Sequence, residues 1–181
     1  MSNSTNPRVA ILMGSDSDLG VMRGAADVLD RFAVPHEVRF LSAHRSPAET
    51  VEYVEAAPER GVQAFICGAG MAAHLAGVVA AHTALPVIGV PLRSESAGLN
   101  GVDALYSTVQ MPPGIPVATV GIGQAGNAAH LAVRILALAD TSLATLLSEY
   151  RAELADGLVA KNARLDDIGI DAYLADRGNT R

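Results

Sequence analysis

Short runs of apolar and β-branched residues alternate with amphipathic segments along the first 139 residues, and this alternation limits the folds open to the chain. The runs expected to be strands are residues 8–13, 36–41, 64–67, 86–90 and 116–122. Apolar residues at spacings of three and four lie between the first two runs and indicate a helix. These are Leu19, Met22, Ala26, Leu29 and Ala33. Nearly continuous apolar strands alternating with helices predict an α/β fold, a three-layer α/β/α sandwich with a parallel, flavodoxin-like sheet.

The segment after residue 139 is expected to be a C-terminal helical extension. Its apolar residues recur at helical spacings and form a narrow seam: Leu143, Leu147, Tyr150, Leu154 and Leu158. Such a seam packs either on its own domain or on another subunit. We expect a disordered tail over residues 1–7 and a single domain over 8–181, with the α/β core at about 8–139 and the C-terminal helices at about 140–177.

The composition indicates one cytoplasmic domain. Half of the 181 residues are hydrophobic and the net charge is −6, which suits one buried core and disfavours nucleic acid as a partner. The polar first residues do not form a signal peptide, and the apolar runs are too short to span a membrane. Cys67 is the single cysteine, which excludes a disulfide framework and fits a reducing compartment. We expect it to be an inert buried residue.

The first predicted strand is followed by "GSDSD", residues 14–18, which fits two interpretations. Ser15 and Asp18 have the spacing of a capping box, in which a hydroxyl and a carboxylate bind free amides at a helix start. The hydroxyls of Ser15 and Ser17, with the helix amides, could instead hold a phosphate. Two aspartates would repel that phosphate, so at least one of them is expected to bind neutral hydroxyls such as a ribose diol.

The second predicted strand is followed by "SAHRSP", residues 42–47. A cap, a first-turn proline and a carboxylate three residues on predict a helix start: Ser46, Pro47 and Glu49. His44 and Arg45 therefore lie at the strand exit, just ahead of a positive helix end. The neutral imidazole favoured there can give or take a proton, and the planar guanidinium suits a phosphate. The alternative is that His44 is an ordinary solvated loop residue.

Small residues follow the third predicted strand in "GAGMAAHLAG", residues 68–77, and would let a ligand approach the backbone. His74 falls in the first turn of the next helix, either as a site residue or as a capping histidine. His82 lies eight residues further on, too far along the helix to share a metal ion with it. No group of residues has ligand spacing, and we expect no metal site.

The segment from Pro91 to Pro116 is rich in glycine and is expected to be one long loop. It is either a surface connection or a wall of a site, because long loops at the carboxyl ends of parallel strands often border binding sites. In a doubly wound sheet these ends lie at one edge, where the three shorter loops also converge.

Six stretches, in one order over about residues 8–138, resemble the aminoimidazole ribonucleotide carboxylase family, in the class I form that acts as 5-(carboxyamino)imidazole ribonucleotide mutase. They are "MGSDSD", "SAHRSP", "GAGMAAHLAG", "PVIGVP", "GVDALYSTVQMPPGIPVATV" and "NAAHLAVRIL". The resemblance implies a cytoplasmic homo-octamer of three-layer subunits that needs no metal and no organic cofactor. It also implies an isomerase of purine and IMP biosynthesis, which moves a carboxylate from the exocyclic nitrogen to carbon 4 of the ribonucleotide.

The same resemblance assigns roles to individual residues. It makes His44 the catalytic acid and base of one catalytic domain. It assigns substrate binding to eight residues: Ser15, Ser17, Asp18, Ser42, Arg45, Gly70, Ala72 and His74. In the proposed cycle His44 protonates the exocyclic nitrogen as carbon dioxide leaves, and then removes the proton from carbon 4 after recarboxylation.

The chain departs from the family pattern in three places. Met71 stands where a glycine is expected, Ala76 stands where a proline is expected, and the loop at 92–101 is a residue or two longer. The sister form of the family carboxylates the ribonucleotide directly with carbon dioxide and typically has lysine at the position of Arg45. That activity is the first alternative, and a flavodoxin-like nucleotide-binding module is a more distant one. The acidic first loop, the absence of tryptophan and the presence of only three phenylalanines argue against a flavin site.

Overall fold

The computed structural model describes residues 6–94 and 98–178, and the chain divides into two compact units after residue 138. In the described part of the first unit, a parallel sheet has the strand order β2-β1-β3-β4-β5. The strands are β1 (Val9–Met13), β2 (His36–Phe40), β3 (Ala64–Gly70), β4 (Val87–Leu92) and β5 (Ala118–Thr119). The predicted parallel sheet is confirmed.

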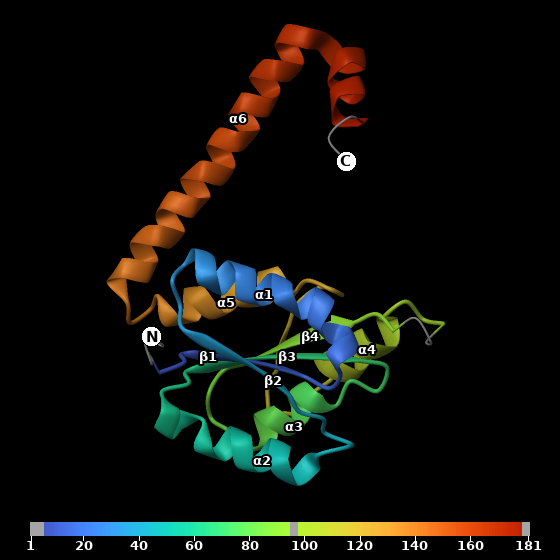
Figure 1. Ribbon diagram of the computed structural model, residues 1–181, viewed down its shortest axis with the longest axis vertical. Coiled ribbons are helices and arrows are strands. Elements are labelled where there is room, and N and C mark those ends of the chain that lie inside the picture. The colour runs from blue at the N-terminus through green and yellow to red at the C-terminus, as the bar shows by residue number, and fades with distance from the viewer. Residues whose placement is uncertain (1–5, 95–97, 179–181) are drawn as a thin grey trace. The chain divides into compact units, whose positions relative to one another are not determined.

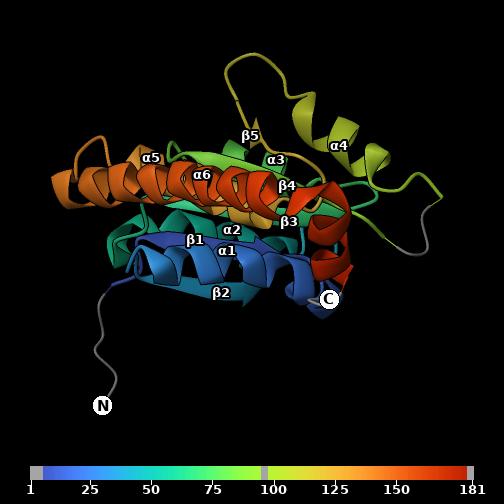
Figure 2. The same ribbon diagram turned by 90° about the horizontal axis from the view of Figure 1, so that it is seen from above.

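Helices cover both faces of this sheet (Figure 1, Figure 2). The helices of the first unit are α1 (Leu19–Arg31), α2 (Pro47–Ala56), α3 (Leu75–Ala81), α4 (Val102–Val109) and α5 (Ala125–Leu136). Helices α1 and α5 pack together on one face, and α2 and α3 lie on the other. Two short 3₁₀ turns, η1 (Asp16–Asp18) and η2 (Pro58–Arg60), precede α1 and follow α2. The expected three-layer sandwich is therefore the observed one.

Successive side chains of a strand point to opposite faces of the sheet, so each central strand contributes to a core on both faces. All five residues of β1 are buried, and their side chains alternate between the two faces. Ala10 and Leu12 belong to the core beneath α2 and α3, together with Phe65 and Cys67 of β3. On the other face, Gly68 leaves room for Met22 of α1, since a Cβ at Gly68 would lie 2.4 Å from the methionine sulfur. Burial raises the pKa of the Cys67 thiol, which fits the expected inert role.

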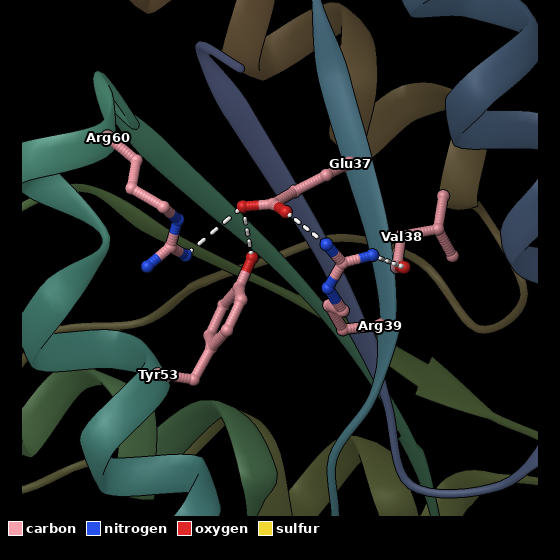
Figure 3. A network of polar contacts seen from close by, with 5 residues as sticks. All are labelled: Glu37, Val38, Arg39, Tyr53 and Arg60. Atoms are coloured by element: carbon pink, nitrogen blue, oxygen red, sulfur yellow. Dashed lines mark hydrogen bonds and ion pairs between the residues drawn. The ribbon is translucent and has the colours of Figure 1, made fainter. Parts of the chain in front are cut away.

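A polar network ties the edge strand β2 to α2 (Figure 3). Tyr53 of α2 donates a hydrogen bond of 2.7 Å to Oε1 of Glu37, and Arg60 donates one of 3.1 Å to the same oxygen. Arg39 forms an ion pair of 2.9 Å with the other carboxylate oxygen. Arg60 also lies over the Tyr53 ring, with its guanidinium carbon 4.6 Å from the ring centre. The network thus connects the two elements that flank the "SAHRSP" loop.

The expectation of one long loop from Pro91 to Pro116 was wrong, because α4 forms within it. Ala104 and Thr108 of α4 are buried, and Thr108 fills the space over β4 that Gly89 leaves open. Connections of more than about fifteen residues rarely lack secondary structure in compact domains. The longer loop expected at 92–101 includes residues 95–97, which lie outside the described part of the chain.

Two strand predictions also need correction. Strand β3 continues to Gly70, because Ala69 and Gly70 pair with Pro91 and Leu92 of β4. Part of the glycine-rich segment is therefore strand rather than loop. Strand β5 has two residues instead of the seven expected, and only Ala118 and Thr119 pair with β4.

The second unit is formed by α6 (Thr141–Gly178), so the predicted C-terminal helical extension is confirmed. Gly169 has non-helical backbone angles, φ 75° and ψ 169°, and divides α6 into two helical parts. Leu143 is buried, whereas Leu154 and Leu158 are 54% and 62% exposed. Among the residues that the structure describes, no helix combines the length and apolar character needed to cross a membrane. Of the predicted tail, residues 1–5 lie outside the described residues.

Candidate active site

A pocket of about 760 Å³ opens at the carboxyl ends of the strands. It is lined by residues that follow β1, β2, β3 and β4, because parallel strands bring these segments to one edge of the sheet. All nine residues selected from the sequence line it: Ser15, Ser17, Asp18, Ser42, His44, Arg45, Gly70, Ala72 and His74. The structure therefore places every predicted site residue around one cavity.

The loop between β1 and α1 presents hydroxyls and one partly buried carboxylate. The Ser15 hydroxyl accepts hydrogen bonds from the Ser17 amide at 3.3 Å and from the Ser17 hydroxyl at 2.9 Å. The Asp18 carboxylate accepts a hydrogen bond from the Ser15 backbone. Of the two bonds in the expected capping box, the one between the Asp18 carboxylate and the Ser15 backbone forms. The Ser15 hydroxyl instead accepts from the Ser17 amide and caps the 3₁₀ turn η1.

The ionisation of Asp18 reflects this position. Partial burial raises the pKa of its carboxyl, and the charge of Asp16 adds to the rise. The hydrogen bond from the Ser15 backbone and the nearby Arg45 guanidinium act in the opposite direction but do not offset the burial. Further hydrogen-bond donors, such as the hydroxyls of a bound ligand, would stabilise the charged form of this carboxylate.

The loop between β2 and α2 is closed by its own serines. The Ser42 amide donates to the Ser46 hydroxyl at 3.0 Å, and the Ser42 hydroxyl accepts from the amides of His44 at 3.3 Å and Arg45 at 3.1 Å. Helix α2 begins at Pro47 as predicted, but Ser46 does not cap it with its side chain, because that hydroxyl binds back to Ser42. These bonds fix the backbone that carries His44 and Arg45.

Arg45 links this loop to the one after β1. Its guanidinium donates a hydrogen bond to the carbonyl oxygen of Gly14, at the exit of β1. It also lies close enough to Asp18 for its charge to offset part of the rise in the pKa of that carboxyl. A planar cation is thereby held beside the hydroxyls of Ser15 and Ser17, which is the donor set that a phosphate prefers.

Two imidazoles meet in the pocket. The Nε2 atom of His44 lies 2.8 Å from the Nδ1 atom of His74, and the ring centres are 4.9 Å apart at an interplanar angle of 78°. A hydrogen bond between these atoms needs one N–H and one lone pair, so the pair in this geometry holds a single proton between the facing nitrogens. The arrangement can deliver a proton to a bound molecule and take one back.

The wall beside the imidazoles is made of small residues and one strained methionine. Met71 has a φ of 56°, in the left-handed region that favours glycine, and the residue is 51% exposed. This explains why a glycine is expected at the position. The His74 amide donates to the Ala72 carbonyl at 2.9 Å, and His74 immediately precedes α3.

Arg93 and Ser94 also line the pocket; they belong to the segment expected as a possible wall, but neither residue was singled out from the sequence. They follow the end of β4, and their position after a parallel strand was the available signal.

Among the described residues, no group of three or more histidine, cysteine, aspartate or glutamate side chains could hold a metal ion.

The site has a cation and hydroxyls suited to a phosphate beside a pair of imidazoles, at the strand ends of a parallel α/β sandwich, and this arrangement is typical of the nucleotide-binding class of α/β proteins. The chain belongs to the AIR carboxylase family, whose model matches residues 8–157. It is 49% identical over 173 residues to an N5-carboxyaminoimidazole ribonucleotide mutase of Pyrococcus horikoshii, covering 96% of this chain and 97% of the relative. It is 53% identical over 171 residues to a protein of the same name from Synechocystis, covering 94% and 96%.

Two further likenesses bear on the fold and on the range of activities. The solved structure of Treponema denticola PurE matches with a TM-score of 0.78 and 33% identity, covering 88% of this chain and 98% of that one. A phosphoribosylaminoimidazole carboxylase of Candida albicans is 48% identical over 176 residues, covering 97% of this chain but only 31% of that longer protein.

Proposed function

We propose that this protein is an N5-carboxyaminoimidazole ribonucleotide mutase, an isomerase of de novo purine biosynthesis. It converts 5-carboxyaminoimidazole ribonucleotide into 4-carboxy-5-aminoimidazole ribonucleotide. The observation that carries the proposal is the imidazole pair of His44 and His74 beside Arg45, in one pocket. The relatives named as this mutase match over nearly their whole length, which supports the same activity here.

The charged end of the substrate is held at the exits of β1 and β2. The Arg45 guanidinium and the hydroxyls of Ser15 and Ser17 donate hydrogen bonds to the phosphate. Asp18 accepts hydrogen bonds from the ribose hydroxyls, and its partial burial strengthens that interaction because fewer water molecules compete for it. Ser42 holds the loop that presents Arg45 and keeps its own O–H group for the ligand.

His44 moves the proton in both halves of the reaction. The imidazolium N–H protonates the exocyclic nitrogen while the carbamate C–N bond breaks, which releases carbon dioxide and neutral aminoimidazole ribonucleotide. The electron-rich carbon 4 then attacks the carbon dioxide and forms the new C–C bond. The imidazole removes the proton from carbon 4, the ring recovers its aromaticity, and His44 is again protonated. No net proton is consumed.

The same pocket must retain carbon dioxide between the two steps. Gly70 and Ala72 line the pocket, and their small size leaves room there for carbon dioxide. Holding both reactants together replaces a bimolecular recapture by a step within one complex. The site therefore needs neither a metal nor an organic cofactor for this chemistry.

Direct carboxylation of aminoimidazole ribonucleotide is the second candidate, supported by the name of the Candida albicans relative. That relative is about three times as long as this chain, and the match covers 97% of this chain. Arg45 favours the mutase, because the directly carboxylating form typically has lysine at this position.

The finer properties of the protein belong to the same proposal. Residues 8–181 act as one catalytic domain in a cytoplasmic homo-octamer, as the resemblance to the family implies. A subunit contact would cover the exposed apolar side chains of Leu154 and Leu158 on α6.

The two activities are separated by a choice of substrate. The purified protein is given the N-carboxylated ribonucleotide at low carbon dioxide and, separately, the uncarboxylated ribonucleotide with bicarbonate. Rapid consumption of the N-carboxylated ribonucleotide alone supports the mutase. Equal or faster consumption of the uncarboxylated ribonucleotide would support the carboxylase instead, and consumption of neither would refute both.

A further inference from the structure

Arg93 is a second permanent cation in the candidate active site. It lines the pocket, its side chain is exposed, and it follows directly after β4. Arg45, the other arginine that lines the pocket, lies after β2 and contacts Gly14 at the exit of β1. The described part of the pocket thus has an arginine on each side.

The backbone of Arg93 is held in place while its side chain is available. A Cβ at Gly101 would lie 3.5 Å from the Arg93 Cα, so the start of α4 packs closely on this residue. Leu92, the residue before it, pairs with Gly70 of β3. No ion pair joins Arg93 to any residue within 6–94 or 98–178.

The spacing of the two arginines fits a ligand with two anionic ends. Strands in a sheet lie about 4.8 Å apart, so the exits of β1 and β4, two strands from each other, are separated by about 10 Å. His74 follows β3, the strand between β1 and β4, and the His44 imidazole contacts it at 2.8 Å. A ribonucleotide with its phosphate at Arg45 would place its heterocycle at the imidazoles and any ring carboxylate toward Arg93.

The charge distribution along the pocket supports this orientation. Asp18 is the single carboxylate among the described lining residues, and it lies on the Arg45 side. The Arg93 side has a cation with no anion beside it among those residues. An arginine in this situation favours a carboxylate over a neutral group, because it can donate two parallel hydrogen bonds to it.

We propose that Arg93 is a specificity-determining residue that binds the carboxylate carried by the heterocycle of the ligand. Through this contact the site prefers carboxylated over uncarboxylated aminoimidazole ribonucleotide. The inference rests on the proposed function for the identity of the nucleotide. It adds a recognition role for a residue of the segment from Pro91 to Pro116 that the sequence analysis did not name individually.

The test compares two equilibrium dissociation constants in each variant. Calorimetry at low salt measures binding of 4-carboxy-5-aminoimidazole ribonucleotide and of the uncarboxylated ribonucleotide. In Arg93→Gln the preference for the carboxylated ligand is expected to fall by about tenfold, with little change for the uncarboxylated one. Arg93→Lys keeps the charge and is expected to retain most of the preference. Arg8→Gln removes one positive charge at the amino end of β1, the opposite end of the sheet, and is the matched control.

Other outcomes overturn the inference. An unchanged preference in Arg93→Gln would remove the specificity role, and equal weakening of both ligands would assign Arg93 to the phosphate or to the fold. Conversion of the N-carboxylated ribonucleotide by the wild-type protein is measured in parallel. Conversion with an unchanged preference refutes the role of Arg93 alone, whereas a wild-type protein that neither binds nor converts the nucleotides refutes the proposed function as well.

Discussion

The Nε2 atom of His44 lies 2.8 Å from the Nδ1 atom of His74, and these two residues come from loops that follow different strands of the sheet. The contact fixes the orientation of the His44 ring and leaves room for one proton between the two nitrogens. A second proton on the pair would place two N–H groups against each other and break the contact. His74 is therefore expected to act as a positioning residue for His44.

This role predicts the behaviour of His74→Phe, which keeps a ring but removes both nitrogens. Turnover is expected to fall by about ten- to a hundredfold, less than the roughly 10²- to 10⁴-fold that a general acid or base itself contributes, because His74 acts through His44, and the substrate KM is expected to change little. The pH dependence of kcat is also expected to change shape, because the pair no longer shares a proton. Steady-state kinetics over a range of pH measure both effects.

His74→Gln is the matched variant, since its amide can still form a hydrogen bond to the imidazole. It is expected to retain more turnover than His74→Phe. A His74→Phe enzyme with wild-type kcat and a wild-type pH profile would show that the contact has no part in the reaction.

Arg45 is expected to contribute to binding rather than to chemistry. Arg45→Gln loses the charge and the fork that bind the phosphate, so the KM is expected to rise by about ten- to a hundredfold with a smaller change in kcat. Arg45→Lys keeps a point charge without the planar fork, and its KM is expected to lie between those of the wild type and Arg45→Gln. An Arg45→Gln enzyme with an unchanged KM would contradict the phosphate role.

Asp18 gives a prediction about stability. Because burial raises its pKa in the folded protein, the folded state binds a proton in a pH window where the unfolded chain has released it. The stability of the wild-type protein therefore falls as the pH rises through that window. Asp18→Asn is expected to be more stable than wild type above the window and to lack this dependence, while binding the substrate more weakly. Thermal unfolding between about pH 3.5 and 7 measures the difference. A lower melting temperature for Asp18→Asn at neutral pH would contradict the sign.

The network around Glu37 gives the opposite dependence on pH. Partial burial raises the pKa of Glu37, but the hydrogen bonds from Tyr53 and Arg60 and the charges of Arg39 and Arg60 outweigh it, and the net pKa is lowered. Its contribution to stability is therefore present above the unfolded-state pKa and is lost as the pH falls through the folded-state value. Glu37→Gln is expected to remove this part of the acid-side loss of stability.

Tyr53→Phe tests the same network at constant charge. It removes the hydrogen bond of 2.7 Å to the Glu37 carboxylate and is expected to lower the free energy of unfolding by about 1 to 2 kcal/mol. Denaturant unfolding of Tyr53→Phe, Glu37→Gln and the double variant gives the coupling between the two residues. Additive losses would show that the hydrogen bond contributes nothing.

The layers of the fold could be predicted from the sequence because each strand and helix has a clear period. Buried parallel strands are apolar on both faces, and β1 reads as one uninterrupted apolar run. Helix α4 was missed because glycines and prolines on both sides of it suggested a loop. What stabilises α4 is the burial of Ala104 and Thr108 against β4, a tertiary contact that local sequence does not show.

The candidate site was predictable to a similar extent. Topology alone brings the ends of four parallel strands together, so loops chosen one at a time met around one pocket. The contact between His44 and His74 could not be foreseen, because the two residues are thirty positions apart and the contact depends on the orientations of both side chains. Arg93 was not singled out because its segment has no motif, and only the end point of β4 places it in the pocket.

The central claim is that the imidazole of His44 relays the proton between the exocyclic nitrogen and carbon 4, and His44→Asn tests it most directly. Ribonucleotide binding and conversion of the N-carboxylated substrate are measured on the same preparation of this variant. We predict that binding stays within a few-fold of wild type and that conversion falls to the rate of the uncatalysed reaction. A variant that binds poorly but converts each bound substrate at the wild-type rate would contradict the account.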